Sequence, residues 1–220
     1  MSAQFEAANV AFASATTTIS VTLTVGAFPN RVLLTSLLTD NGGITTITDN
    51  GVADLTQYRS VASTLALFTH SKVAPSAGFH TISVTVSVPS NLALSVRSYY
   101  NVNQVTPIAT SLGASSVTSA IALSSGLTGN IGNLAVDFLG WSSGGSITAT
   151  ENGGQTERFN QVDTVLGSAG SDLIMTATLP TMDWALSLAT PSCLIGTVLQ
   201  AEQDQTPDRT MPCQWFQSWS

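Results

Sequence analysis

Charged side chains are scarce in this chain of 220 residues, because Asp, Glu, Lys and Arg together make up only 9% of it. Lys72 is the single lysine, and the 13 acidic residues outnumber the basic ones, which leaves a formal net charge of -7. A negative protein repels phosphate backbones, so we expect no binding to nucleic acid. Serine and threonine supply the polar surface instead. Such a surface suits a protein that packs against others, although threonine also fits exposed sheet for structural reasons alone.

Cysteine and long apolar runs are also scarce. Cys193 and Cys213 are the two cysteines; they make no disulfide framework and lack zinc-site spacing, and whether they pair stays open. No segment approaches the roughly 18 consecutive apolar residues of a membrane span. The N-terminus has neither the basic region nor the apolar run of a secretory signal. We therefore expect synthesis in the cytoplasm, and we expect no membrane, metal or cofactor.

Alternating apolar and polar residues dominate what is present. In Thr16–Val25 the apolar residues share one face and Thr or Ser the other, as in a half-buried strand. The pattern recurs at residues 31–39, 63–71, 80–88, 92–100, 133–141, 171–179 and 192–200. Turn signals such as Asp49-Asn50-Gly51 lie between these segments, and no amphipathic helix is evident. The sequence predicts an all-β fold, a single antiparallel two-sheet β-sandwich that is jelly-roll-like.

The end of the chain departs from this pattern. We expect residues 1–204 to form one sandwich domain without internal repeats, and residues 205–220 to form an extended C-terminal arm. Prolines in the arm favour extended backbone, and its aromatic side chains are costly to leave in water. The arm could fold back on the sandwich or dock on a neighbour. We predict partner binding by Pro207, Pro212, Trp215, Phe216 and Trp219.

The segment Gly140–Gly144, GWSSG, matches the G-x-S-x-G pattern in which Ser142 would be the nucleophile of a serine hydrolase. That role requires a helix after the serine, whereas the following residues are typical of a strand and a hairpin. The family order Ser, acid, His also fails, because His70 and His80 both precede Ser142. The segment is therefore interpreted as a strand that runs into a Ser-Gly loop.

Other polar residues favour structural interpretations. His70 and His80 lie in strand contexts without a third ligand in H-x-H or H-x-x-E spacing, so neither a metal nor a catalytic role is predicted. The aspartates 40, 49 and 54 lack calcium-loop spacing and are interpreted as turn formers.

Asp137 is unusual because it lies inside an apolar strand. It is either a buried partner of Arg97 or, by simple alternation, a residue of the outer face, and we favour the outer face.

Two motifs carry a resemblance to a known family. His80-Thr81-Ile82-Ser83-Val84 follows a small-residue turn, and residues 100–108 read YNVNQVTPI. Residues 16–108 thereby resemble a β-sandwich module of tailed-phage virion proteins and related phage-encoded or bacterial surface proteins, whereas the second half matches only in style. These motifs are structural, so the resemblance implies a component that binds rather than reacts.

Within that family, a compact domain with an arm and no stalk indicates a capsid decoration or cement protein. We expect it on the virion, bound to the outer capsid surface and bridging capsomers, with the major capsid protein or other virion subunits as partners. We also expect a homo-oligomer, with a trimer as the guess. The alternative is a tail-associated receptor- or carbohydrate-binding module with Tyr99, Tyr100, Trp141 and Trp184 as stacking platforms. An enzyme would need a cleft with Ser142 or paired carboxylates, and no enzymatic activity is predicted.

Overall fold

A computed structural model describes residues 2–123, 126–152 and 154–202, and every regular element among them is a β-strand in antiparallel pairing. This confirms the predicted all-β class. The strands are β1 (Gln4–Val25), β2 (Val32–Thr39), β3 (Ile44–Asp49), β4 (Thr56–Ala62), β5 (Ala66–Val73), β6 (Gly78–Tyr100), β7 (Ile108–Ser116), β8 (Ala120–Leu123), β9 (Leu134–Ser142), β10 (Ala149–Glu151), β11 (Thr156–Val162), β12 (Leu166–Ile174), β13 (Met182–Leu186) and β14 (Ser192–Leu199).

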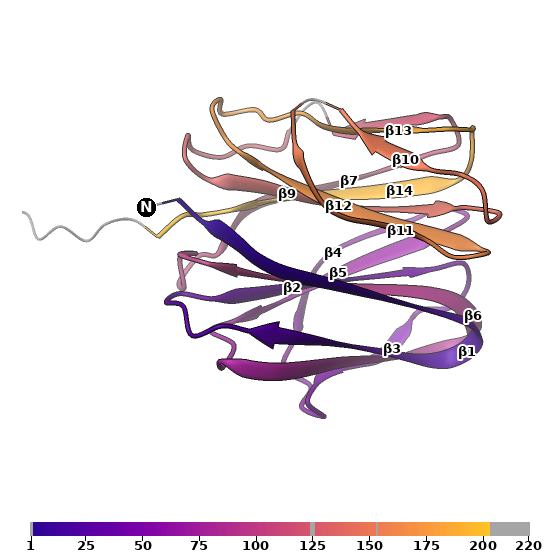
Figure 1. The fold of residues 1–220 in the computed structure, drawn as a ribbon, viewed down its shortest axis with the longest axis horizontal. Helices are drawn as coiled ribbons and strands as arrows, with labels where there is room; N and C mark the ends of the chain where they lie inside the picture. Colours follow the sequence, from indigo (N-terminus) through magenta and orange to yellow (C-terminus); the bar gives the residue numbers. More distant parts are fainter. Residues whose placement is uncertain (1, 124–125, 153, 203–220) are drawn as a thin grey trace, which may run out of the picture.

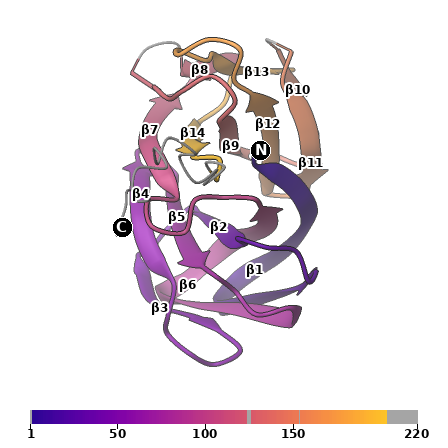
Figure 2. The same ribbon diagram turned by 90° about the vertical axis from the view of Figure 1, so that its left-hand side faces the viewer.

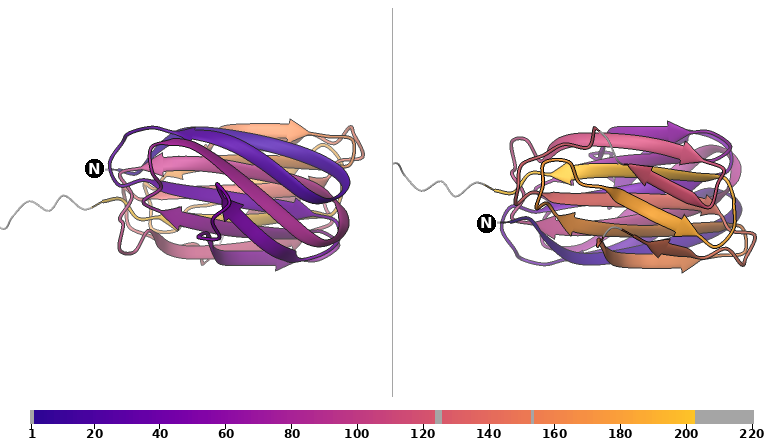
Figure 3. Two further views of the ribbon diagram at one scale, coloured as in Figure 1. Left: turned by 90° about the horizontal axis from the view of Figure 1, so that it is seen from below. Right: turned by 90° about the horizontal axis from the view of Figure 1, so that it is seen from above.

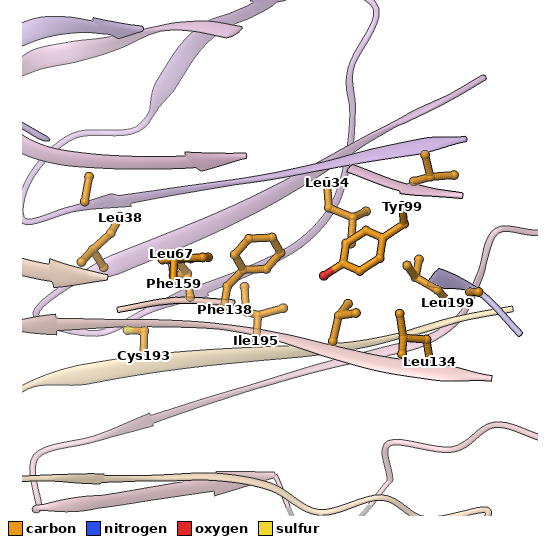
Figure 4. Close-up of a cluster of buried hydrophobic side chains, with 14 of the residues drawn as sticks. Leu34, Leu38, Leu67, Tyr99, Leu134, Phe138, Phe159, Cys193, Ile195 and Leu199 are labelled. Atoms are coloured by element: carbon orange, nitrogen blue, oxygen red, sulfur yellow. The ribbon is translucent and has the colours of Figure 1, made fainter. Parts of the chain in front are cut away.

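Two large sheets pack face to face, which confirms the predicted sandwich (Figure 1). The first sheet has the order β1-β6-β2-β5-β4, and the second has the order β11-β12-β9-β14-β7. Their facing side chains form the central core, where Leu34, Leu38 and Tyr99 of the first sheet meet Phe138 and Ile195 of the second (Figure 4). Alternation along each strand supplies this inner face.

The first sheet also folds back on itself. β1 and β6 are long enough to run along the sandwich, bend at its end and return, and register shifts around Ala15, which has a φ of 50°, mark the bend. The returning parts of β1 and β6 pair with each other, and β3 pairs with β6. We call residues 16–25, 44–49 and 78–86 the fold-back layer; Figure 3 shows it crossing the strands of the first sheet.

A purely aliphatic core joins the fold-back layer to the first sheet. It contains Ile19, Val21, Leu23, Val25, Leu33, Leu37, Ile82, Val84, Val86, Leu92, Leu94 and Val96. The opposite face of this layer carries Thr and Ser, and Thr22 and Thr81 lie side by side there with their hydroxyls 3.3 Å apart.

A small third sheet, β10-β13-β8, covers the outer face of the second sheet (Figure 1). Its core is partly aromatic, because the fully buried Trp141 and Trp184 pack there with Leu139 and Leu194. A second cluster around Met175 and other apolar residues extends this core.

The two halves of the chain repeat one strand order, although no internal repeat is expected from the sequence. β7, β14, β9, β12 and β11 take the places of β1, β6, β2, β5 and β4, and the third sheet takes the place of the fold-back layer. Backbone features recur with the same spacing of 102 residues: Asn30 and Gly132 both have positive φ, as do Gly42 and Gly144. Figure 2 shows the two halves stacked on each other.

Candidate binding surface and buried polar sites

Ser142 ends β9 and does not open a helix. The residues that follow form a turn with positive φ at Gly144 and Gly145, and then strand β10. The Ser142 main chain is held by the loop before β14, since its N–H donates to the Pro191 carbonyl (3.0 Å). A nucleophile elbow needs a strand-turn-helix geometry that this segment lacks.

Asp137 lies on the outer face of the second sheet, as alternation predicts, but the third sheet buries it completely. Its two carboxylate oxygens accept hydrogen bonds from the Trp184 indole N–H (2.8 Å) and the Ser171 main-chain N–H (2.7 Å). Burial raises the pKa of this carboxyl to about 6, although Arg97 and both hydrogen bonds act to lower it. Asp137 therefore joins the second and third sheets from within.

Arg97 lies on β6 of the first sheet, fully buried between the two large sheets, and faces β9 from the side opposite to the Asp137 carboxylate. Its guanidinium donates to the main-chain carbonyls of Ser171 (2.9 Å) and Asp137, and it stacks over the Phe138 ring at 3.9 Å. The two residues thus meet through the Asp137 main chain, and the carboxylate faces away. The sequence offers two alternatives for Asp137, a buried pair with Arg97 or a place on the outer face of the sheet. In the structure Asp137 lies on the outer face, as favoured, and it is nevertheless buried.

A second polar cluster links the fold-back layer to the first sheet. Asp49 Oδ2 is 2.7 Å from Lys72 Nζ and 2.6 Å from His80 Nδ1, and Lys72 also pairs with Asp54 (2.6 Å). His80 Nε2 lies 2.8 Å from the Ser76 carbonyl, so both ring nitrogens face acceptors. Both contacts are satisfied when both nitrogens carry protons. The single lysine of the chain is therefore committed to an internal contact.

The other titratable residues considered in the sequence lie apart from one another. His70 lies on β5 and is buried, which lowers its pKa to about 4. Asp40 accepts a hydrogen bond from the Asn91 main chain (2.9 Å), in keeping with a turn former. Across the described ranges, no three side chains of His, Cys, Asp or Glu gather to hold a metal ion. Within the same ranges, no helix has the length and apolar character to cross a membrane.

Three of the four aromatic residues proposed as sugar platforms are buried. Trp141, Trp184 and Tyr99 are fully enclosed, so none can stack on a ligand. The Trp141 indole N–H donates to the Ile147 carbonyl (2.9 Å), which locks it in the core. Tyr100 remains accessible and stacks on Phe28, with ring centroids 4.4 Å apart.

Sequence reasoning misses the surface at one end of the sandwich, which we call the exit end. It consists of the loops 26–31, 101–107, 129–133 and 175–181, and of residues 200–202, where the described chain leaves it. The two halves are joined there, because Val102 bridges to Ala201 and the Asn103 N–H donates to the Gln200 carbonyl (2.9 Å). Figures 1 and 3 show the N-terminus at the same end.

Exposed apolar side chains gather at the exit end. Of the twelve large apolar residues exposed in the described part of the chain, four lie there, Phe28, Val105, Ile131 and Leu179, and two more, Val73 and Ile174, end strands β5 and β12 beside it. Val105 and Ile131 are the most exposed of these, at 88% and 69%. The only signal in the sequence is an apolar residue in each of several polar loops, and the loops meet through long-range contacts that no local pattern reveals. Clustered exposed apolar residues are typical of an interaction surface.

The five arm residues predicted to bind a partner, Pro207, Pro212, Trp215, Phe216 and Trp219, lie outside the described residues, as does Cys213. Cys193 is buried in the central core, where its thiol contacts the Leu65 carbonyl at 3.4 Å and burial raises its pKa. Comparison of the chain with family models, curated proteins and solved structures finds no match. The resemblance to the phage module therefore stays a prediction from its motifs.

Proposed function

We propose that this protein is a non-enzymatic structural component of a virion, a decoration or cement protein that binds the outer capsid shell and attaches through the exit end. The observation that carries the proposal is the gathering of four exposed apolar side chains at the exit end, with Val73 and Ile174 beside them, where the described chain continues toward its aromatic C-terminal residues. Apolar side chains with few charges around them resemble the central part of protein interfaces. Repeated attachment over a lattice would add avidity to a small contact.

The internal polar clusters support a structural function in a second way. The charged side chains in these clusters form hydrogen bonds and ion pairs that join layers of the sandwich; they belong to Asp137, Arg97, Asp49 and Lys72. The buried charges in these clusters therefore contribute to the assembly of the domain.

A first experiment is to image purified virions of the source with gold-labelled antibody against this chain. Label over the head supports the shell position, whereas label at a tail tip supports the alternative of a tail-associated receptor- or carbohydrate-binding module. The stacked Phe28–Tyr100 pair is the specific feature in favour of that alternative. Binding of the protein to a glycan array, lost in Tyr100→Ala, would establish it.

A matched pair of variants tests the attachment surface. Val105→Asp with Ile131→Asp places two charges on the exit end, and Val117→Asp with Leu188→Asp places two at exposed sites (67% and 60%) at the other end. Purified capsids should bind the first variant at least about tenfold more weakly than the wild type, which corresponds to about 1.4 kcal/mol. The second variant should bind normally. Equal binding by both variants would rule out attachment through the exit end.

A further inference from the structure

A pocket of about 240 Å³ opens beside the exit end, between the beginning of β1 and the edge of the second sheet. Figure 2 shows the N-terminus at the start of β1 close to β11 and β12. Phe5, Leu134, Arg158, Asp172 and Ile174 are among the residues that line it. The volume is below the roughly 300–1,000 Å³ of typical cofactor sites, so it suits one ring system rather than a large ligand.

The chemistry of the pocket favours an aromatic guest. Arg158 is held by two hydrogen bonds to Asp172 (2.7 and 2.8 Å), and its guanidinium lies 4.3 Å from the Phe5 ring centroid. Ile174 is 51% exposed and offers an apolar wall. Arginine planes and aliphatic side chains stack on aromatic rings. Because Asp172 already neutralises Arg158, an anionic ligand gains little there.

The described part of the chain ends close to this pocket. The Ala201 N–H donates to the Asn133 side chain (3.2 Å). Leu134, which follows Asn133 in the sequence, lines the pocket. Twelve residues, 203–214, then separate the described chain from Trp215. A fully extended chain of twelve residues can span up to about 37 Å, at about 3.1 Å per residue. That reach is long enough for Trp215 to meet the pocket of a neighbouring copy.

We propose that this pocket binds the aromatic end of the C-terminal segment, residues 215–219, of a second copy of this chain. The contact joins two different surfaces, so it can close into a ring of copies, in keeping with the expected homo-oligomer. The inference deepens the proposed function, because linked copies would lie side by side on the shell. It names a second copy as the partner, whereas the exit end faces the capsid.

Cysteine cross-linking of the full-length chain tests this proposal, because Cys213 lies two residues before Trp215. Ile174→Cys places a thiol at the pocket, and Val162→Cys, 40% exposed at the far end of the same sheet, is the matched control. Both are made with Cys193→Ser, which removes the buried thiol. After mild oxidation, Ile174→Cys should give at least about tenfold more disulfide-linked dimers and larger species than the control, because docking raises the effective thiol concentration.

The other outcomes overturn the proposal. A disulfide within one monomer would show that the segment folds back on its own molecule, and thiol loss no greater than in the control would show that the pocket does not bind it. Capsid binding by the exit-end variants is measured separately. A failed cross-link with normal capsid binding rejects only this inference, and a formed cross-link without capsid binding rejects only the proposed function.

Discussion

The two halves of the molecule share a strand order but differ in how the outer layer is held. In the first half, continuous strands β1 and β6 carry the chain into the fold-back layer, and the core beneath it is entirely aliphatic. In the second half, the strand that corresponds to β1 is divided into β7 and β8, and the strand that corresponds to β6 is divided into β13 and β14. The core beneath contains two tryptophans, and one of them, Trp184, binds a buried carboxylate. The same topology thus forms over an aliphatic core and over a core with tryptophans. Alternation along the strands defines the layers, and the identity of the core side chains can differ between the halves.

Removal of the buried carboxylate should have the largest effect. Asp137→Ala leaves the Trp184 indole and the Ser171 N–H without their acceptor and takes a negative charge from the neighbourhood of Arg97. We expect a loss of about 3–5 kcal/mol in the free energy of unfolding at pH 7. Urea denaturation followed by tryptophan fluorescence measures it. A loss below about 1 kcal/mol would mean that the second half does not depend on this polar centre.

His70 in the first half and Asp137 in the second half should change the stability in opposite directions on acidification. The pKa of His70 is lowered to about 4, so as pH falls from 6.5 to 4 only the unfolded chain takes up that proton, and stability is lost. The pKa of Asp137 is raised to about 6 from 3.8, so over pH 6 to 4 the folded chain takes up the proton first, and stability is gained. Each contribution reaches up to about 3 kcal/mol near pH 4.

Denaturation at a series of pH values separates these contributions. On acidification, His70→Gln should lose less stability than the wild type, and Asp137→Asn should lose more. Two variants whose pH profiles run parallel to that of the wild type would contradict this assignment.

The smallest effect is expected at the position of the first half that corresponds to Asp137. Thr35 lies 102 residues earlier on β2, and its buried hydroxyl has no hydrogen-bond partner, directly across from His70. Thr35→Val keeps the shape and removes the unpaired hydroxyl, so thermal unfolding should show a change between zero and about 1 kcal/mol of stabilisation. Destabilisation of the variant by more than about 1 kcal/mol would mean that the Thr35 hydroxyl has a hydrogen-bond partner in solution.

The strands and the sandwich could be predicted from the sequence because alternation is a local signal. The fold-back layer could not be predicted, because the bend lies at Ala15, and alanine is not a residue whose presence indicates a positive φ. The repeat left only weak traces, such as Gly42-Gly43 recurring as Gly144-Gly145.

The buried polar sites depend on contacts between distant residues. Alternation correctly places Asp137 on the outer face of its sheet, but its burial comes from Trp184, 47 residues away. The same third sheet buries Trp141 and Trp184, which the alternative of a carbohydrate-binding module requires to be exposed. The interpretation of GWSSG as a strand end followed by a loop is confirmed, because glycine and β-branched residues after Ser142 act locally.

The pairing of β1 with β6 sets an order of events during synthesis. Gln4 pairs with Tyr100, and Ile108 with Leu199, so each half is closed by its own first and last large strands. The ribosome must deliver residue 78 before β1 can begin to pair with β6 and residue 100 before that pairing is complete, and β7 gains β14 only after residues 192–199 are made. Until then the nascent chain carries unpaired strand edges, the form of the polypeptide most open to wrong pairing.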